Sequence, residues 1–113
     1  MSTILAGLVV LDEPPVTAVT ATVIFSLIDT SFADALTTPI YRVSLSQKLD
    51  TDTVQFPFQI RLPANVRLSR DVELQVVIDN DGDNIPSRGD YVSTQSNAVL
   101  QQIHALQIRV QRI

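Results

Sequence analysis

The sequence predicts an all-β protein, a single compact β-sandwich of about seven mainly antiparallel strands that spans residues 1–113. Valine, isoleucine and threonine dominate the chain, and side chains branched at Cβ fit the pleated surface of a sheet. Apolar and polar residues alternate with a period of two in one segment after another, which is the pattern of half-buried strands. Turn residues separate these segments at short intervals, as is typical of sandwich domains.

The expected strands are the segments with this alternation and, near the start of the chain, an apolar run that ends before two prolines. They cover residues 4–11, 17–29, 40–46, 54–62, 72–78, 91–94 and 105–113. Three of these strands set one apolar face each toward a core. The faces are Val19, Ala21, Val23, Phe25 and Leu27 in residues 17–29, Tyr41, Val43 and Leu45 in residues 40–46, and Leu106, Ile108 and Val110 in residues 105–113. The fourth does the same with Phe56, Phe58, Ile60 and Leu62. Pro57 inside it indicates an edge strand or a bulge, because proline has no N–H to donate.

Three segments interrupt the strands. Residues 31–36 are expected to form one helical turn, with Ser31 as its cap and Asp34 near its positive end. The polar residues 47–53 predict a turn, and residues 63–70 predict a loop that crosses to the next strand.

Composition excludes several classes of protein. A chain with 45% apolar and 18% charged residues is too hydrophobic for intrinsic disorder. The absence of cysteine excludes disulfides and cysteine-ligated zinc. The net charge of −4 argues against a nucleic-acid partner. The longest apolar run, residues 4–11, is shorter than the roughly 20 residues of a membrane-spanning helix, so no transmembrane segment is expected.

Catalysis is not expected either. The chain has one histidine, His104, and no Gly-x-Ser-x-Gly nucleophile elbow. Three glycines in total leave no phosphate-binding loop. A single histidine without a partner nucleophile has no general-base task, so His104 is interpreted as a surface or partly buried structural residue.

The acidic loop, residues 79–90, is the most informative stretch. Its aspartates, Asp79, Asp81, Asp83 and Asp90, together with Arg88 give it most of the net charge of the chain. Calcium takes six to eight oxygen ligands, and aspartates spaced two residues apart resemble the start of an EF-hand-type loop. The spacing is incomplete, because Asn84 stands where that loop has its glycine. The four aspartates are therefore candidate Ca²⁺ ligands, and a solvated hairpin turn is the competing interpretation, since Asp, Asn and Gly are common turn residues.

Two further features bear on partners. Arg88, Gly89 and Asp90 form an integrin-type tripeptide, a match short enough to arise by chance. The polar faces with Thr17, Thr20 and Thr22 and with Arg42, Ser44 and Ser46 are candidates for a polypeptide partner, but half of each sandwich strand faces water in any case. Exposed sheet edges also leave a homo-oligomer open.

Four local motifs, in order along the chain, resemble the YbaY/YscW-type domains, small envelope lipoproteins that include the pilotin-like chaperones of type III secretion. A glycine in the first strand, Gly7, is followed by the proline turn Pro14–Pro15. The long second strand ends in residues 27–35, LIDTSFADA, similar to the family's Asp-x-Ser-x-Ala-Asp-Ala run. Residues 56–63, FPFQIRLP, are similar to its Pro-Phe stretch.

The resemblance implies a non-catalytic β-sandwich in the periplasm or cell envelope and, for the pilotin branch, a secretin as polypeptide partner. Asp29, Ser31, Ala33 and Asp34 match the motif and are interpreted as holding the turn after the long strand. The chain departs from the family in three ways: it has no lipidated cysteine, its loop at residues 79–90 is longer and more acidic, and its last strand extends beyond the matched part to Ile113. Leu8 stands where the cysteine would follow Leu5-Ala6-Gly7, and the first residues carry no lysine or arginine of an export signal. The leading hypothesis is an assembly module that binds a polypeptide through a sheet edge or face; the alternative is a calcium-binding β-module.

Overall fold

The computed structural model describes residues 3–30, 39–80, 89–94, 98–99 and 104–113. These ranges contain seven strands: β1 (Thr3–Leu11), β2 (Val19–Asp29), β3 (Tyr41–Leu49), β4 (Gln55–Leu62), β5 (Val72–Asp79), β6 (Tyr91–Ser93) and β7 (Leu106–Arg112). The all-β prediction is confirmed for this part of the chain. It has no helix that is long and apolar enough to cross a membrane. The expected helical turn at residues 31–36 lies outside the described residues.

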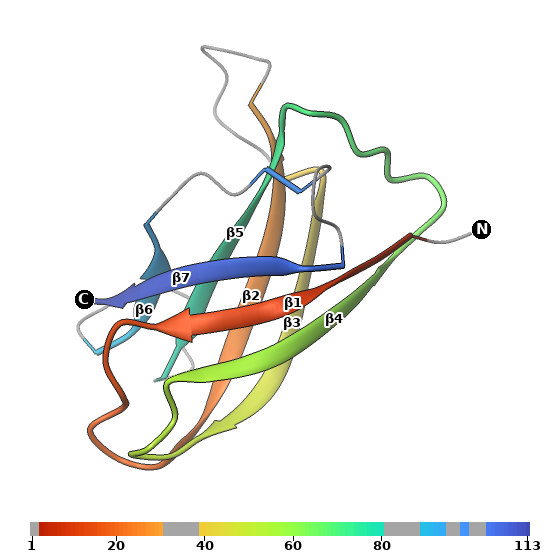
Figure 1. Ribbon diagram of the computed structural model, residues 1–113. Helices are drawn as coiled ribbons and strands as arrows, with labels where there is room; N and C mark the ends of the chain where they lie inside the picture. The colour runs from red at the N-terminus through yellow and green to blue at the C-terminus, as the bar shows by residue number, and fades with distance from the viewer. Residues whose placement is uncertain (1–2, 31–38, 81–88, 95–97, 100–103) are drawn as a thin grey trace.

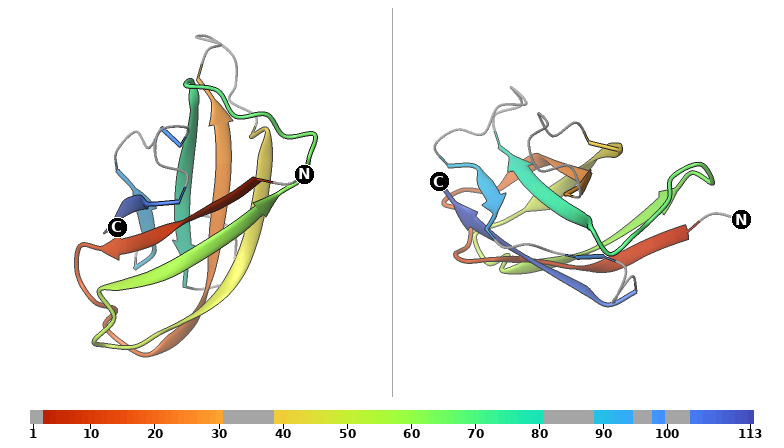
Figure 2. Two further views of the ribbon diagram at one scale, coloured as in Figure 1. Left: turned by 45° about the vertical axis from the view of Figure 1, so that its right-hand side comes forward. Right: turned by 90° about the horizontal axis from the view of Figure 1, so that it is seen from above.

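All seven strands belong to one sheet, in the order β3-β2-β5-β6-β7-β1-β4. Every neighbouring pair is antiparallel except β1 and β7, which run parallel. In Figure 1, β7, β1 and β4 pass in front of β5, β2 and β3 at a steep angle, and the view from above in Figure 2 shows the sheet curling round between them. The expected sandwich of two sheets is therefore replaced by a half-barrel made from one. The short strand β6 pairs with both β5 and β7, so the two layers remain continuous.

The core lies inside this curl. Phe25 lies on β2, the second strand in the sheet order, and Phe58 lies on β4, the last, yet their ring centroids lie 5.0 Å apart with the planes tilted by 34°. Aromatic pairs favour such tilted geometries over a flat sandwich of rings. The expected core faces of β2, β4 and β7 are confirmed: all but the half-buried Val19 are buried, namely Ala21, Val23, Phe25, Leu27, Phe56, Phe58, Ile60, Leu62, Leu106, Ile108 and Val110.

The expected turn at residues 47–53 begins too early. Gln47, Lys48 and Leu49 continue β3 and pair with Ala21, Thr20 and Val19. Pairing to a long neighbouring strand outweighs the polar character of Gln47 and Lys48, and Leu49 is buried. The turn itself occupies 50–53 and is an Asx-type turn, in which the Asp52 amide donates to Asp50 Oδ1 over 2.9 Å.

The two ends of the sheet, β3 and β4, are its free edges. Leu45 on β3 was expected to face the core, and it is 40% exposed because no strand covers its outer side. The prediction that Pro57 marks an edge strand is confirmed by the position of β4. The Leu11 amide donates to the Val54 carbonyl over 2.8 Å, which makes Leu11 and Val54 a hydrogen-bonded pair. In an antiparallel ladder, hydrogen-bonded pairs alternate with pairs that exchange no hydrogen bonds. Leu8 and Pro57 lie an odd number of positions from Leu11 and Val54, so they form a pair without hydrogen bonds between them. The missing N–H of Pro57 therefore falls on the free edge.

Candidate binding surfaces

The outer face of β1 is apolar, although it does not belong to the core. Leu5, Val9 and Leu11 point inward and are buried, whereas the alternate residues are half-buried on the outside. These outward residues, here called the β1 stripe, are Ile4, Ala6, Leu8 and Val10. A strand with one face toward water normally carries polar residues there. The β1 stripe is therefore an apolar part of the outer surface that needs an explanation.

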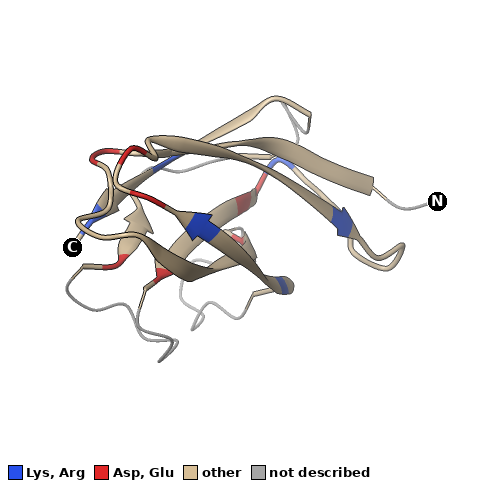
Figure 3. Ribbon diagram, turned by 90° about the horizontal axis from the view of Figure 1, so that it is seen from below, with Lys and Arg blue, Asp and Glu red and all other residues tan. Residues whose placement is uncertain are grey.

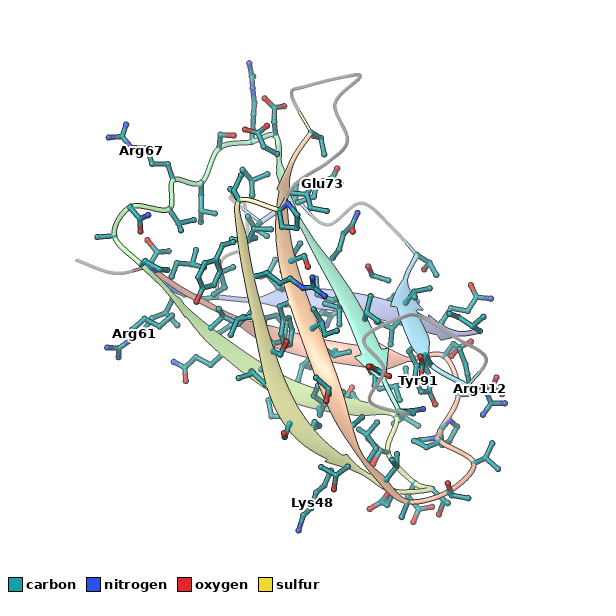
Figure 4. All side chains as sticks on the ribbon, turned by 180° about the vertical axis from the view of Figure 1, so that it is seen from behind. Lys48, Arg61, Arg67, Glu73, Tyr91 and Arg112 are labelled. Carbon is teal, nitrogen blue, oxygen red and sulfur yellow. The ribbon has the colours of Figure 1, made fainter. Side chains whose placement is uncertain are left out.

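Long polar side chains border the β1 stripe on both sides. On β4 the pairing places Arg61 beside Ile4, Gln59 beside Ala6 and Pro57 beside Leu8, all exposed. On β7 it places Gln107 beside Leu8 and Arg109 beside Val10, again exposed. The outward positions of these three strands include two arginines and no acidic residue. Most of the described ribbon is uncharged, as Figure 3 shows, and the label in Figure 4 places Arg61 projecting away from the sheet.

A shallow groove of about 740 Å³ crosses this layer. Its lining comes from the adjacent strands β1, β4 and β7 and from the two residues before β7: Ala6, Gly7, Leu8, Pro57, Phe58, Gln59, His104, Ala105, Leu106 and Gln107. His104 is exposed at this groove, in agreement with its interpretation as a surface residue. The groove and the β1 stripe together form a candidate surface for another macromolecule, since apolar patches rimmed by polar residues are typical of interaction sites.

The base of the acidic loop is a second candidate site. Asp79 and Asp90 are the residues directly beyond the Ile78–Tyr91 pair of β5 and β6, and each is 1% exposed. Asp90 Oδ1 accepts a hydrogen bond from the Asn80 amide over 2.8 Å, and Asn80 Nδ2 donates to the Gly89 carbonyl over 2.6 Å. The structure thus brings two of the four expected calcium ligands to the same place. Asp81 and Asp83 lie outside the described residues.

One atom at this base is unusual. Asn80 Oδ1 is buried and has no hydrogen-bond partner among the described residues. A buried carbonyl-type oxygen without a donor costs about 1–3 kcal/mol. Within the described ranges, no three acidic or histidine side chains gather closely enough to hold a metal ion. The expected calcium site is neither confirmed nor contradicted.

The burial of Asp90 also bears on the integrin-type tripeptide. Arg88 lies outside the described residues, and Gly89 has a φ of 96°. The Asp90 carboxylate is turned inward onto the Asn80 amide, so a partner has no access to it. Gly89 and Asp90 therefore hold the base of the acidic loop through their hydrogen bonds with Asn80.

Tyr91 ties this end of the molecule together. Its hydroxyl donates to the Glu13 carbonyl over 2.9 Å, and Arg112 makes an ion pair with Glu13 at 3.0 Å. Figure 4 shows Tyr91 and Arg112 side by side. Burial raises the pKa of Tyr91, an effect that Arg112 partly offsets. The turn after β1 is thus fixed to β6 and β7, which supports an architectural role for this cluster.

The polar faces expected as a partner surface lie on the other layer. Thr20, Thr22 and Ser26 on β2 face outward beside Lys48, Ser46 and Arg42 on β3. Thr20, Arg42, Ser44 and Ser46 are exposed. Ile24 and Ile28, also outward on β2, are buried at 3% and 7% exposure, so this face is not uniformly polar.

Comparison with known proteins gives one informative likeness. No protein-family model and no curated protein sequence matches the chain. Among solved structures, the chain is similar to an alternative pilotin from the type II secretion system of Vibrio cholerae, with a TM-score of 0.65 and 16% identity over 98% of both chains. The two chains share one fold. The expected resemblance to pilotin-like envelope domains is confirmed for the fold, and the match includes nearly the whole half-barrel.

Sequence reasoning missed the outer groove. Its residues come from β1, β4 and β7, which are neighbours only through pairings distant in sequence. A signal was present, because residues 4–11 form an unbroken apolar run, whereas the other strands alternate. Such a run is typical of a strand covered on both faces.

Proposed function

We propose that this protein is a non-catalytic assembly module of the cell envelope that binds a secretin-like polypeptide, in the manner of a pilotin. The observation that carries the proposal is the fold shared over 98% of both chains with a type II secretion pilotin. The resemblance of the sequence motifs to YbaY/YscW-type domains supports the same class of function independently of the structure.

The described surface also supports binding over catalysis. The groove on the outer layer is shallow and is lined by apolar, glutamine and backbone groups, with His104 exposed at its start. Such a lining supplies contact area and hydrogen bonds, which a docking surface needs, but it brings no nucleophile next to a base.

The test is binding to secretins encoded in the same genome. Purified protein is titrated with recombinant segments that together cover each secretin, and the affinity is measured by calorimetry. We expect one segment to bind with a Kd of about 1 μM or lower, which corresponds to about −8 kcal/mol. Circular dichroism confirms that the protein is folded in each titration. If every segment fails to bind the folded protein, the proposal is wrong.

A second function is a calcium-stabilised loop at residues 79–90. The observation that favours it is the buried Asn80 Oδ1, which has no donor among the described residues and belongs to the residue whose backbone amide donates to the buried Asp90. A cation at this base would take Asn80 Oδ1 as one oxygen ligand, with Asp79, Asp81, Asp83 and Asp90 as the carboxylates in reach along the chain.

Thermal unfolding with chelator and then with millimolar Ca²⁺ tests this second function. We expect calcium to raise the Tm by about 4–8 °C, the effect of about 1 kcal/mol in a domain of this size, because an ion that binds only the folded state stabilises it. Magnesium controls for general ionic effects. Asp81→Asn should reduce the calcium response and leave the Tm in chelator unchanged. An identical Tm with calcium and with chelator would show that the loop at residues 79–90 does not bind calcium.

A further inference from the structure

We propose that the β1 stripe and its groove are the docking surface of this protein, and that its occupant is an amphipathic helix with acidic residues beside its apolar face. This inference rests on the proposed function for the identity of the partner but not for the location of the site. Three structural observations lead to it: the pairing of β1, the half-buried apolar side chains on its outer face, and the charge around that face.

The pairing of β1 excludes one mode of binding. β1 is bonded to β4 on one side and to β7 on the other, so its backbone groups are taken up in the sheet. A partner strand cannot add there, because strand addition needs an open edge. A partner on the β1 stripe must instead bind through side chains laid on the sheet, and a helix with one apolar face is one of the elements that cover sheet faces in proteins.

The true edges are less suitable for a partner strand. β4 has Pro57 in its middle, with its missing donor on the free side, and carries Arg61 near its end. β3 carries Arg42 and Lys48. Proline and exposed charges are the features by which natural sheets discourage strand addition at an edge. The outer face of β1 carries none of these features.

The dimensions of the β1 stripe fit a short helix. Its residues run from Ile4 to Val10, and at about 3.3 Å per residue this is roughly 20 Å of strand. A helix that rises about 1.5 Å per residue covers that length with about 13 residues. Its apolar side would contact Leu8 and Val10, while its flanks would lie over the side chains of β4 and β7.

The charge of the border defines those flanks. Arg61 and Arg109 are exposed at the two ends of the β1 stripe, on opposite sides of it, and the neighbouring outward positions are glutamines and a proline. No acidic residue occupies an outward position of β1, β4 or β7, although the whole chain has a net charge of −4. Complementary charge selects partners more than it adds affinity. The border therefore favours glutamate or aspartate beside the apolar face of the helix and disfavours lysine.

Two synthetic peptides test the surface without any secretin. Both are about 13 residues long and helical with one leucine face; one has glutamates along its flanks and its twin has lysines at the same positions. We expect the glutamate peptide to bind at least about ten-fold more tightly by fluorescence anisotropy. Amide shifts in NMR spectra should be concentrated on β1, β4 and β7. Equal binding of the twins, or shifts elsewhere, would overturn the proposal.

Matched variants locate the site. Leu8→Asp should weaken the binding of the glutamate peptide at least about ten-fold. Leu45→Asp, the same change on the edge strand β3, should alter the affinity for that peptide less than about two-fold. Because Leu8→Asp risks misfolding, the double variant Arg61→Glu with Arg109→Glu provides a second measurement at exposed positions. We expect the double variant to bind the lysine peptide more tightly than the glutamate peptide. Retained preference in the folded double variant would contradict the assignment.

A secretin segment then separates the two proposals. If a segment binds wild type and Leu8→Asp equally, the function stands and this surface is wrong. If the glutamate peptide binds the β1 stripe but every secretin segment fails, the surface stands and the proposed partner is wrong.

Discussion

Gly7 shows how one residue permits the packing of two strands. It sits on β1 between Phe58 on β4 and Leu106 on β7. A Cβ atom at Gly7 would collide with the carbonyl group and Cβ of Leu106. Because the obstructing atoms include backbone, they cannot rotate away as the end of a side chain does. The parallel pairing of β1 and β7 therefore requires glycine at this position.

Gly7→Ala should consequently lower the free energy of unfolding by about 2–4 kcal/mol, since it forces β1 and β7 apart. Urea denaturation measures the change. Gly89→Ala is the matched control: Gly89 has a φ of 96°, but a Cβ atom there would meet nothing within 4 Å. Its cost should be about 1 kcal/mol, from backbone strain alone. Equal costs at the two glycines would show that the close approach at Leu106 is not a constraint.

Tyr91 couples the fold to pH through a buried hydroxyl. Burial raises its pKa above the ordinary value of 10.0. As pH rises past 10.0, the unfolded chain releases this proton before the folded protein does. The resulting stability is complete below pH 10.0 and is lost as pH rises through the higher folded-state pKa.

Tyr91→Phe should lower the free energy of unfolding at neutral pH by about 1 kcal/mol, because the hydrogen bond to the Glu13 carbonyl is lost. The difference between wild type and variant should narrow above pH 10.0, where only wild type loses stability through this ionisation. Urea midpoints at neutral and alkaline pH measure both effects. A difference that is constant with pH would mean that Tyr91 does not titrate differently in the two states.

At the scale of elements, the strands were predictable and their arrangement was not. Period-two alternation located the strands of the core such as β4 and β7, whose inward residues must match the core. An unbroken apolar run located β1. It failed at Gln47 and Lys48, where pairing with β2 decides the structure. It also gave no information on the parallel pair β1–β7, which joins residues about a hundred positions apart. The groove depends on that pair, so the sequence alone did not reveal it.

The acidic loop was predictable only in part. Its composition indicated either a calcium site or a solvated hairpin turn, and the buried Asp79 and Asp90 at its base are compatible with both. The orientation of Asp90 toward the Asn80 amide depends on the pairing of β5 with β6, which composition does not encode.

Pro57 protects the free edge of β4, and its replacement should expose that edge. Pro57→Val restores an N–H on the open side, so we expect concentration-dependent dimers by light scattering and a change in unfolding free energy below about 0.5 kcal/mol. Gln59→Val is the control, because it adds the same side chain at the next outward position without a new donor. If both variants associate equally, added hydrophobicity rather than the new donor is responsible.

At the scale of the whole molecule, charge is unevenly distributed. The net charge of −4 is concentrated in the acidic loop, while the outward positions of β4, β1 and β7 carry only positive charge. At physiological salt the Debye length is about 8 Å, so charges on distant parts of the molecule are largely screened from this face. A partner there meets the local arginines rather than the net charge.

The half-barrel is held closed across its interior by contacts between its two layers. Phe25 and Phe58 make such a contact, with ring centroids 5.0 Å apart. Their strands, β2 and β4, are not paired with each other in the sheet. The coupling between these rings therefore measures how strongly the curled layers stabilise one another, separately from backbone pairing.

A double-mutant cycle measures that coupling. Phe25→Leu and Phe58→Leu should each lower the free energy of unfolding by about 1–3 kcal/mol, and the double variant should cost about 0.5–1.5 kcal/mol less than their sum, because the ring pair is lost only once. Phe58→Leu combined with Ile78→Val, which lies on β5, should be additive. Additivity in the Phe25–Phe58 cycle would mean that general burial, and not this ring contact, holds the two layers together.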